Sequence, residues 1–99
     1  MLHIVNKSPT ERNTLDSCLR LAEQGSALLL IEDGVYAVTR GNAAESSLRA
    51  AMPRLTVYAL AADLEARGMS ARVMDGVKLV DYGGFVDLVC EQRNCQSWL

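Results

Sequence analysis

The sequence predicts an α/β protein, a single three-layer α/β/α domain built on a mainly parallel sheet. Short aliphatic runs alternate along the chain with segments whose apolar residues recur at helical spacing. One run, residues 27–31 (ALLLI), is apolar at every position, which is typical of a strand covered on both faces. Parallel strands need long crossover connections, and the helical segments between the runs supply them.

The first strand is expected at residues 2–5, where a short apolar run ends in an Asn-Lys-Ser-Pro loop. The helix that follows has two candidate starts. Ser8 lies at capping-box spacing from Glu11, and Thr14 is a second candidate cap. Gly25 is the expected helix stop, and the fully apolar strand follows at residue 27.

Residues 32–38 (EDGVYAV) allow two interpretations. Asp-Gly between apolar runs is a strong hairpin signal. The alternative is a strand-to-helix turn in which Asp33 caps a short helical segment, and a parallel sheet favours it because hairpins join antiparallel strands. Residues 43–51 then favour helix, which Pro53 ends.

The second half of the chain repeats the alternation. A third strand is expected at residues 55–60, followed by a short helix at 61–67 that Gly68 closes. A fourth strand is expected at residues 77–80 and a last helix at 85–92. The polar tail beyond this helix carries no strand or helix pattern.

The chain has 99 residues, and the expected organisation is one domain over residues 1–99. Its hydrophobic share of 49% is high for so small a domain, and a buried subunit interface is the simplest place for the excess. The net charge of -2, with no basic stripe, argues against direct nucleic-acid binding. No signal peptide or membrane span is apparent, so we expect a soluble cytoplasmic protein with no membrane partner.

The expected carboxyl ends of the strands carry mostly acidic residues, namely Glu32, Asp33, Asp63 and Asp81. An acidic rim repels phosphate, and neither a GxGxxG nor a GxxxxGK[ST] pattern is present. Carboxylates can hold a hard cation, but acids also favour helix starts, and we prefer that second interpretation. The sequence therefore predicts no cofactor and no metal.

Three cysteines stand at Cys18, Cys90 and Cys95, in a spacing that fits neither a disulfide framework nor a zinc site. Cys18 lies in the first helix. Near the helix start its pKa would fall and it could act as a reactive thiol. On the apolar helix face it would instead be an inert core cysteine, because free cysteine is among the most buried residue types. We expect Cys90 to fill core or interface and Cys95 to be an exposed thiol.

Two further residues invite a functional interpretation. His3 is the only histidine, and no Ser or Cys partner can be placed against it, so a catalytic triad is not supported. A structural histidine is the expected role. Trp98 lies in the tail, where a large aromatic side chain either docks on its own domain or anchors a partner.

Several segments together resemble the DsrH/TusB family. They are residues 2–9 (LHIVNKSP), 28–37 (LLLIEDGVYA), 57–60 (VYAL), 63–64 (DL) with 66–68 (ARG), 81–82 (DY) with 85–88 (FVDL), and the tryptophan-bearing tail. Each segment alone is weakly specific, but they follow one another in the family's order along nearly the whole chain.

The resemblance implies a DsrEFH-like fold and a heterohexamer with two copies each of three related subunits. It implies partners similar to DsrE/TusD and DsrF/TusC, and a downstream sulfur acceptor similar to DsrC/TusE. Such complexes relay persulfide sulfur toward tRNA 2-thiouridine synthesis or serve sulfur oxidation, and the principal sulfur-carrying cysteine lies on the DsrE/TusD-like partner. Cys18 matches a helix cysteine of DsrH-like members and is the candidate persulfide carrier here. The alternative is a non-catalytic subunit that positions the partner's cysteine.

Overall fold

The structure is a computed structural model that describes residues 1–92 and 94–98. Its elements follow in the order β1 (Leu2–Val5), α1 (Thr14–Leu21), β2 (Ala27–Leu30), η1 (Glu32–Val38), α2 (Glu45–Ala51), β3 (Thr56–Leu60), α3 (Ala61–Ala66), η2 (Ser70–Arg72), β4 (Lys78–Val80), α4 (Tyr82–Glu91) and β5 (Cys95–Trp98). The two η elements are 3₁₀ helices.

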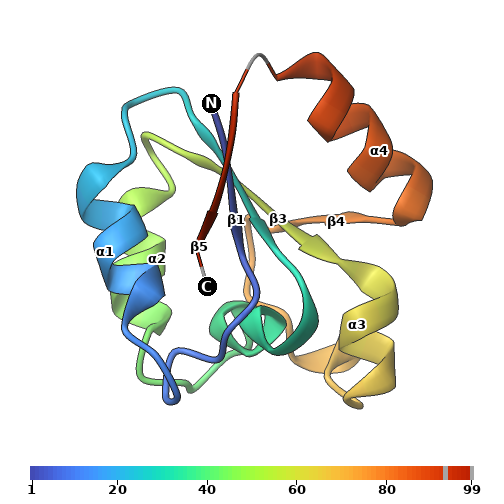
Figure 1. Cartoon of the computed structure of the whole chain (residues 1–99). Helices are drawn as coiled ribbons and strands as arrows, with labels where there is room; N and C mark the ends of the chain where they lie inside the picture. Colours follow the sequence, from blue (N-terminus) through green and yellow to red (C-terminus); the bar gives the residue numbers. More distant parts are fainter. Residues whose placement is uncertain (93, 99) are drawn as a thin grey trace.

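The five strands form one sheet in the order β4-β3-β2-β1-β5 (Figure 1). All four strand pairs are parallel. The strongly aliphatic β2 lies in the centre, and each of its four residues is buried. Parallel pairing brings the carboxyl ends of all five strands to one edge of the sheet.

Helices cover the sheet on both faces. Helices α1 and α2 lie on one face and α4 lies on the other (Figure 1). The side chains of successive strand residues point to opposite faces of the sheet, so the strands contribute residues to two apolar clusters. The larger cluster joins β2 and β3 to α1 and α2, and the smaller one joins β1 and β2 to Leu88 of α4. The predicted three-layer α/β architecture with a parallel sheet is confirmed.

The four predicted strands and the short helix after β3 lie within one residue of their expected bounds. The first helix begins at Thr14 rather than Ser8. Residues 32–38 form the 3₁₀ helix η1, so the hairpin is excluded. However, Asp33 does not cap η1, because Ile31 holds the capping position and no side chain caps it. Asp33 pairs with Arg67 instead.

Strand β5 and the short 3₁₀ helix η2 were not predicted, and α4 begins earlier than expected. The tail forms a fifth strand, β5, along the edge of β1, although its polar letters lack the alternation typical of a strand. The last helix begins at Tyr82, three residues before its predicted start, because the Asp81 carboxylate caps it by accepting from the Gly84 N–H at 2.7 Å.

Among the described residues, no helix is long and apolar enough to cross a membrane.

Candidate functional site

Cys18 lies in the second turn of α1, a helix that begins at Thr14. Leu15 and Leu19 flank it on the buried face of this helix, and all three belong to the larger apolar cluster. The exposed fraction of Cys18 is 0%. The surroundings of Cys18 are therefore those of a core cysteine, the second of the two interpretations of this residue.

Burial also governs the ionisation of this thiol. Removal from water disfavours the thiolate and raises the pKa of Cys18 to about 11, although the nearby Arg54 guanidinium opposes this rise. The thiolate is the nucleophile in sulfur exchange, so a thiol with this pKa is almost wholly protonated at neutral pH. Proximity to the start of α1 does not outweigh the loss of hydration.

Arg54 comes from the loop after α2 and reaches across to the end of α1. Its guanidinium donates to the Ala22 carbonyl at 2.7 Å and to the Leu19 carbonyl, so it satisfies two carbonyls that the helix end leaves without partners. No sequence pattern pointed to Arg54, because its partners lie more than thirty residues away.

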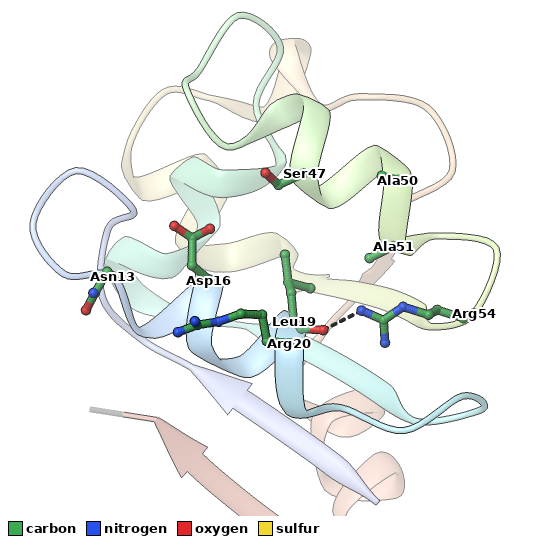
Figure 2. Close-up of a pocket in the computed structure, with 8 residues that line it drawn as sticks. All are labelled: Asn13, Asp16, Leu19, Arg20, Ser47, Ala50, Ala51 and Arg54. Carbon is green, nitrogen blue, oxygen red and sulfur yellow. Dashed lines mark hydrogen bonds between the residues drawn. The ribbon is translucent and has the colours of Figure 1, made fainter.

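Beside this contact, α1 and α2 border a shallow groove of about 740 Å³ (Figure 2). Its walls carry Asp16, Arg20 and Arg54, together with small side chains of α2. Over the part of the chain that the structure describes, Leu19 lines the groove and Cys18 does not. The groove therefore gives no access to the thiol in this conformation.

Asp33 and Asp63, at the carboxyl edge of the sheet, make contacts within the protein. The Asp63 carboxylate accepts from the Glu32 N–H at 2.6 Å, and Arg67 lies 2.9 Å from Asp33. Glu32 adopts a left-handed backbone conformation, with φ of 50°, where the chain turns from β2 into η1. Among the described residues, no three His, Cys, Asp or Glu side chains gather as a metal site.

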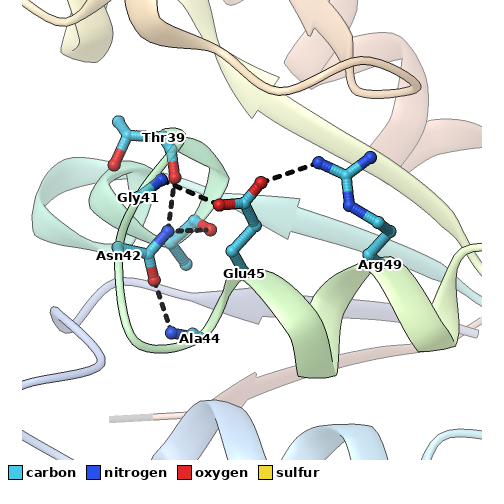
Figure 3. Close-up of polar contacts among 7 residues, drawn as sticks. Thr39, Gly41, Asn42, Ala44, Glu45 and Arg49 are labelled. Carbon is cyan, nitrogen blue, oxygen red and sulfur yellow. Dashed lines mark hydrogen bonds and ion pairs between the residues drawn. The ribbon is translucent and has the colours of Figure 1, made fainter.

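A second polar network forms the start of α2 (Figure 3). The Asn42 side chain donates to the Ala37 and Thr39 carbonyls at 3.0 and 2.5 Å and accepts from the Ala44 N–H at 2.6 Å. The Gly41 N–H and Arg49 both donate to Glu45, and these two bonds lower the pKa of the Glu45 carboxyl. Asparagine before a helix is a capping signal, so the sequence did contain a clue to this network.

The remaining candidates are Trp98, His3 and the other two cysteines. Trp98 of β5 packs against the larger apolar cluster, and its indole N–H donates to Nδ1 of His3 at 3.1 Å. Trp98 thus docks on its own domain, and His3 is a structural histidine with a satisfied ring nitrogen. Cys90 and Cys95 are both exposed. Cys90 therefore does not fill the core, whereas its expected place in a subunit interface stays a prediction, and the exposed Cys95 agrees with its expectation.

Comparisons with known proteins agree with this fold. The family model described as "DsrH like protein" matches residues 7–95. The chain is 45% identical to Protein TusB of Salmonella dublin and of Salmonella enteritidis PT4 over 80 residues, covering 81% of this chain and 82% of each relative.

Two solved structures share the fold at low identity. The ychN protein from E. coli superposes with a TM-score of 0.80 at 20% identity, covering 97% of each chain. MTH1491 from Methanobacterium thermoautotrophicum gives 0.77 at 19% identity, covering 97% of this chain and 95% of the other. Because the family model spans nearly the whole chain and the relatives are so similar, this protein belongs to the family of DsrH-like proteins.

Proposed function

We propose that this chain is a subunit of a cytoplasmic sulfur-relay complex that serves tRNA thiolation. The similarity to TusB proteins supports this pathway, and sulfur oxidation is the alternative within the same family. The proposed partners are the DsrE/TusD-like and DsrF/TusC-like subunits in a heterohexamer, with a DsrC/TusE-like protein as the sulfur acceptor. Three free thiols in the described chain agree with a reducing compartment.

Within the complex, we assign this chain the role of positioning a partner's sulfur-carrying cysteine. The observation that supports this role most is the complete burial of Cys18 on the inward face of α1. Sulfur relay requires a thiolate that attacks the terminal sulfur of a donor persulfide. The donor S–S bond then breaks, the donor leaves as a thiolate, and a new persulfide forms on the attacking cysteine. A buried, protonated thiol is poorly suited to that attack.

Cys18 as a persulfide carrier is the second candidate function. The Arg54 guanidinium supports it, because a nearby positive charge favours the thiolate. For this role α1 has to shift in the assembled complex, so that Sγ becomes reachable from solvent or from a partner's persulfide.

The two candidates are separated by loading the purified complex with a low-molecular-weight persulfide and measuring intact masses. For the positioning role we expect sulfur on the partner subunit, none on Cys18, and unchanged transfer to the acceptor by a Cys18→Ala complex. Alanine is the matched variant because it keeps the site apolar. A mass increase of one sulfur atom at Cys18, with loss of transfer in the variant, would support the carrier role instead.

A further inference from the structure

The groove between α1 and α2 is apolar in its middle and charged at its two ends (Figure 2). Leu19 of α1 and the small side chains of Ala50 and Ala51 on α2 form the apolar part. Asp16 lies toward one end of this part, and the Arg54 guanidinium lies at the other. The volume of about 740 Å³ is within the range of sites that hold small molecules.

Arg54 is a fixed positive charge that still has hydrogen-bond donors to offer. Its side chain is part-buried, and its hydrogen bonds to the Leu19 and Ala22 carbonyls hold the guanidinium in place. A guanidinium has more N–H donors than these two bonds use. In the part of the chain that the structure describes, no Asp or Glu carboxylate pairs with Arg54. A guanidinium held in this way can bind a carboxylate with little further loss of side-chain freedom.

Asp16 supplies the opposite charge. Its carboxylate is exposed and points from α1 toward α2 (Figure 2). Arg20, one turn further along α1, lies 3.5 Å from the Ser17 hydroxyl, and over residues 1–92 and 94–98 no Lys or Arg pairs with Asp16. A free carboxylate attracts an ammonium group and repels a polyanion such as nucleic acid. A molecule that suits both ends therefore carries an ammonium group, a carboxylate and an apolar body between them.

We propose that the α1–α2 groove is a binding site for a short free peptide. The terminal ammonium of the peptide pairs with Asp16 and its terminal carboxylate with Arg54. Its apolar side chains lie over Leu19, Ala50 and Ala51. An extended peptide of two or three residues spans about 7–10 Å. The α1 wall from Asn13 to Arg20 is of similar length, about 10 Å. The inference concerns a ligand of this chain itself and does not depend on the proposed relay function.

The test is titration of the isotope-labelled full-length chain with the tripeptide Ala-Leu-Ala, followed by NMR. We expect saturable chemical-shift changes in α1, in α2 and at the Arg54 Nε–H, with a dissociation constant of about 1 mM or below. The N-acetylated tripeptide lacks the ammonium group, and the C-terminal amide lacks the carboxylate. Each should bind about threefold to tenfold more weakly than the free tripeptide, because each loses one charged contact.

Two variants assign these losses to the two ends of the groove. Asp16→Asn should bind the free and the acetylated tripeptide equally, and Arg54→Gln should bind the free tripeptide and its amide equally. Asp75→Asn is the matched control, because Asp75 is an exposed acid in the loop before β4 and does not line the groove. It should bind all three peptides as the wild type does.

Arg54 also caps α1, so the circular dichroism spectrum of Arg54→Gln is measured first. If that variant does not fold, the comparison of Asp16→Asn with Asp75→Asn, together with the amide peptide on the wild type, still decides the question. Equal binding of all three peptides by the wild type would overturn the proposal. So would chemical-shift changes outside the groove alone, or none that saturate.

Discussion

At the residue scale, the environment of a cysteine decides its chemistry more than its place in a helix. Cys18 and Cys95 have the same side chain, yet one is fully buried and the other lies exposed on an edge strand. Position near a helix start predicts a lowered pKa, and burial predicts a raised one. Because Cys18 is surrounded by leucines rather than by water, burial prevails.

Iodoacetamide labelling of the native chain at pH 7.5 tests this difference. We expect Cys90 and Cys95 to be alkylated rapidly and Cys18 to stay unlabelled, because its thiol is inaccessible and its pKa is raised to about 11. Peptide mass spectrometry measures each site. In guanidinium chloride all three should react, and fast labelling of Cys18 in the folded chain would contradict its burial.

His3 makes stability depend on pH. Burial and the nearby N-terminal ammonium lower the pKa of His3 from its ordinary value of 6.5, so the folded state favours the neutral ring. The stability that this preference contributes is present above pH 6.5 and is lost as pH falls through the lowered folded value. The melting temperature should therefore decrease between pH 7.5 and 5.5.

His3→Gln is the matched variant for this measurement, because glutamine retains an acceptor for the Trp98 indole N–H but does not titrate. Its melting temperature should vary less over the same pH range than that of the wild type. An equal decrease in both proteins would assign the pH dependence to other groups.

At the element scale, the turn from β2 into η1 depends on a close approach of backbones. A Cβ added at Gly34 would lie 2.3 Å from the Val5 carbonyl oxygen at the end of β1. Since both sides of this contact are main chain, no side chain can move to relieve it. We expect Gly34→Ala to lower the free energy of unfolding by at least about 2 kcal/mol, measured by urea denaturation.

Gly83→Ala provides the control for this substitution. Gly83 lies in α4, and its added Cβ comes no closer than 3.4 Å to another atom, the Asp81 Oδ1. Its effect should stay within about 1 kcal/mol. Equal destabilisation by the two variants would mean that the close approach of Gly34 to β1 is not what makes alanine costly there.

The start of α2 depends on Asn42, which makes three hydrogen bonds to the backbone. Asn42→Ala should cost about 1–3 kcal/mol of stability, because it leaves part-buried backbone groups without partners. Asn42→Asp keeps the acceptor for the Ala44 N–H and loses the donors, so we expect an intermediate cost. The exposed Ser46→Ala, on the same helix, should change stability by less than about 0.5 kcal/mol in the same denaturation experiment.

The helices and strands that the sequence predicted are those with strong local patterns. The aliphatic run of β2 is a local pattern, and so is the helical spacing of Leu15, Cys18 and Leu19. Each can be recognised from a few neighbouring residues. Strand β5 was not predicted, because its residues are mostly polar and it is held in the sheet by pairing with β1, which is distant in sequence. The same reason applies to the site, because Arg54 caps α1 from a distant loop and only the fold brings the two together.

At the scale of the whole molecule, helices α1 and α2 cover one face of the sheet, and within the described residues α4 is the helix that covers the other (Figure 1). The high hydrophobic share of 49% suggests a subunit interface, and α4 is one place where the structure leaves large apolar side chains exposed, namely Tyr82 and Val86. The burial of Cys18 and the exposure of α4 together favour a chain that contributes surfaces to a complex rather than a nucleophile.

The edge strand β5 is expected to protect β1. A chain shortened to end at Asn94 lacks β5 and the Trp98 indole that bonds His3. It leaves the backbone of β1 unpaired along one side, and an unpaired edge invites association between molecules. We expect a lower melting temperature and earlier elution on size exclusion, whereas monomeric elution at full stability would show that β5 is dispensable.

The pairing of β1 with β5 also has a kinetic consequence. Leu2 lies opposite Cys95, so this ladder joins positions 93 residues apart, whereas β1 and β2 join positions only 25 apart. Closing a longer loop costs more chain entropy, and contacts between distant positions slow folding. The β1–β2–β3 core can therefore form first, and the first and last strands meet late. Until they do, the backbone of β1 is unpaired along one edge of the sheet, and an unpaired edge favours aggregation.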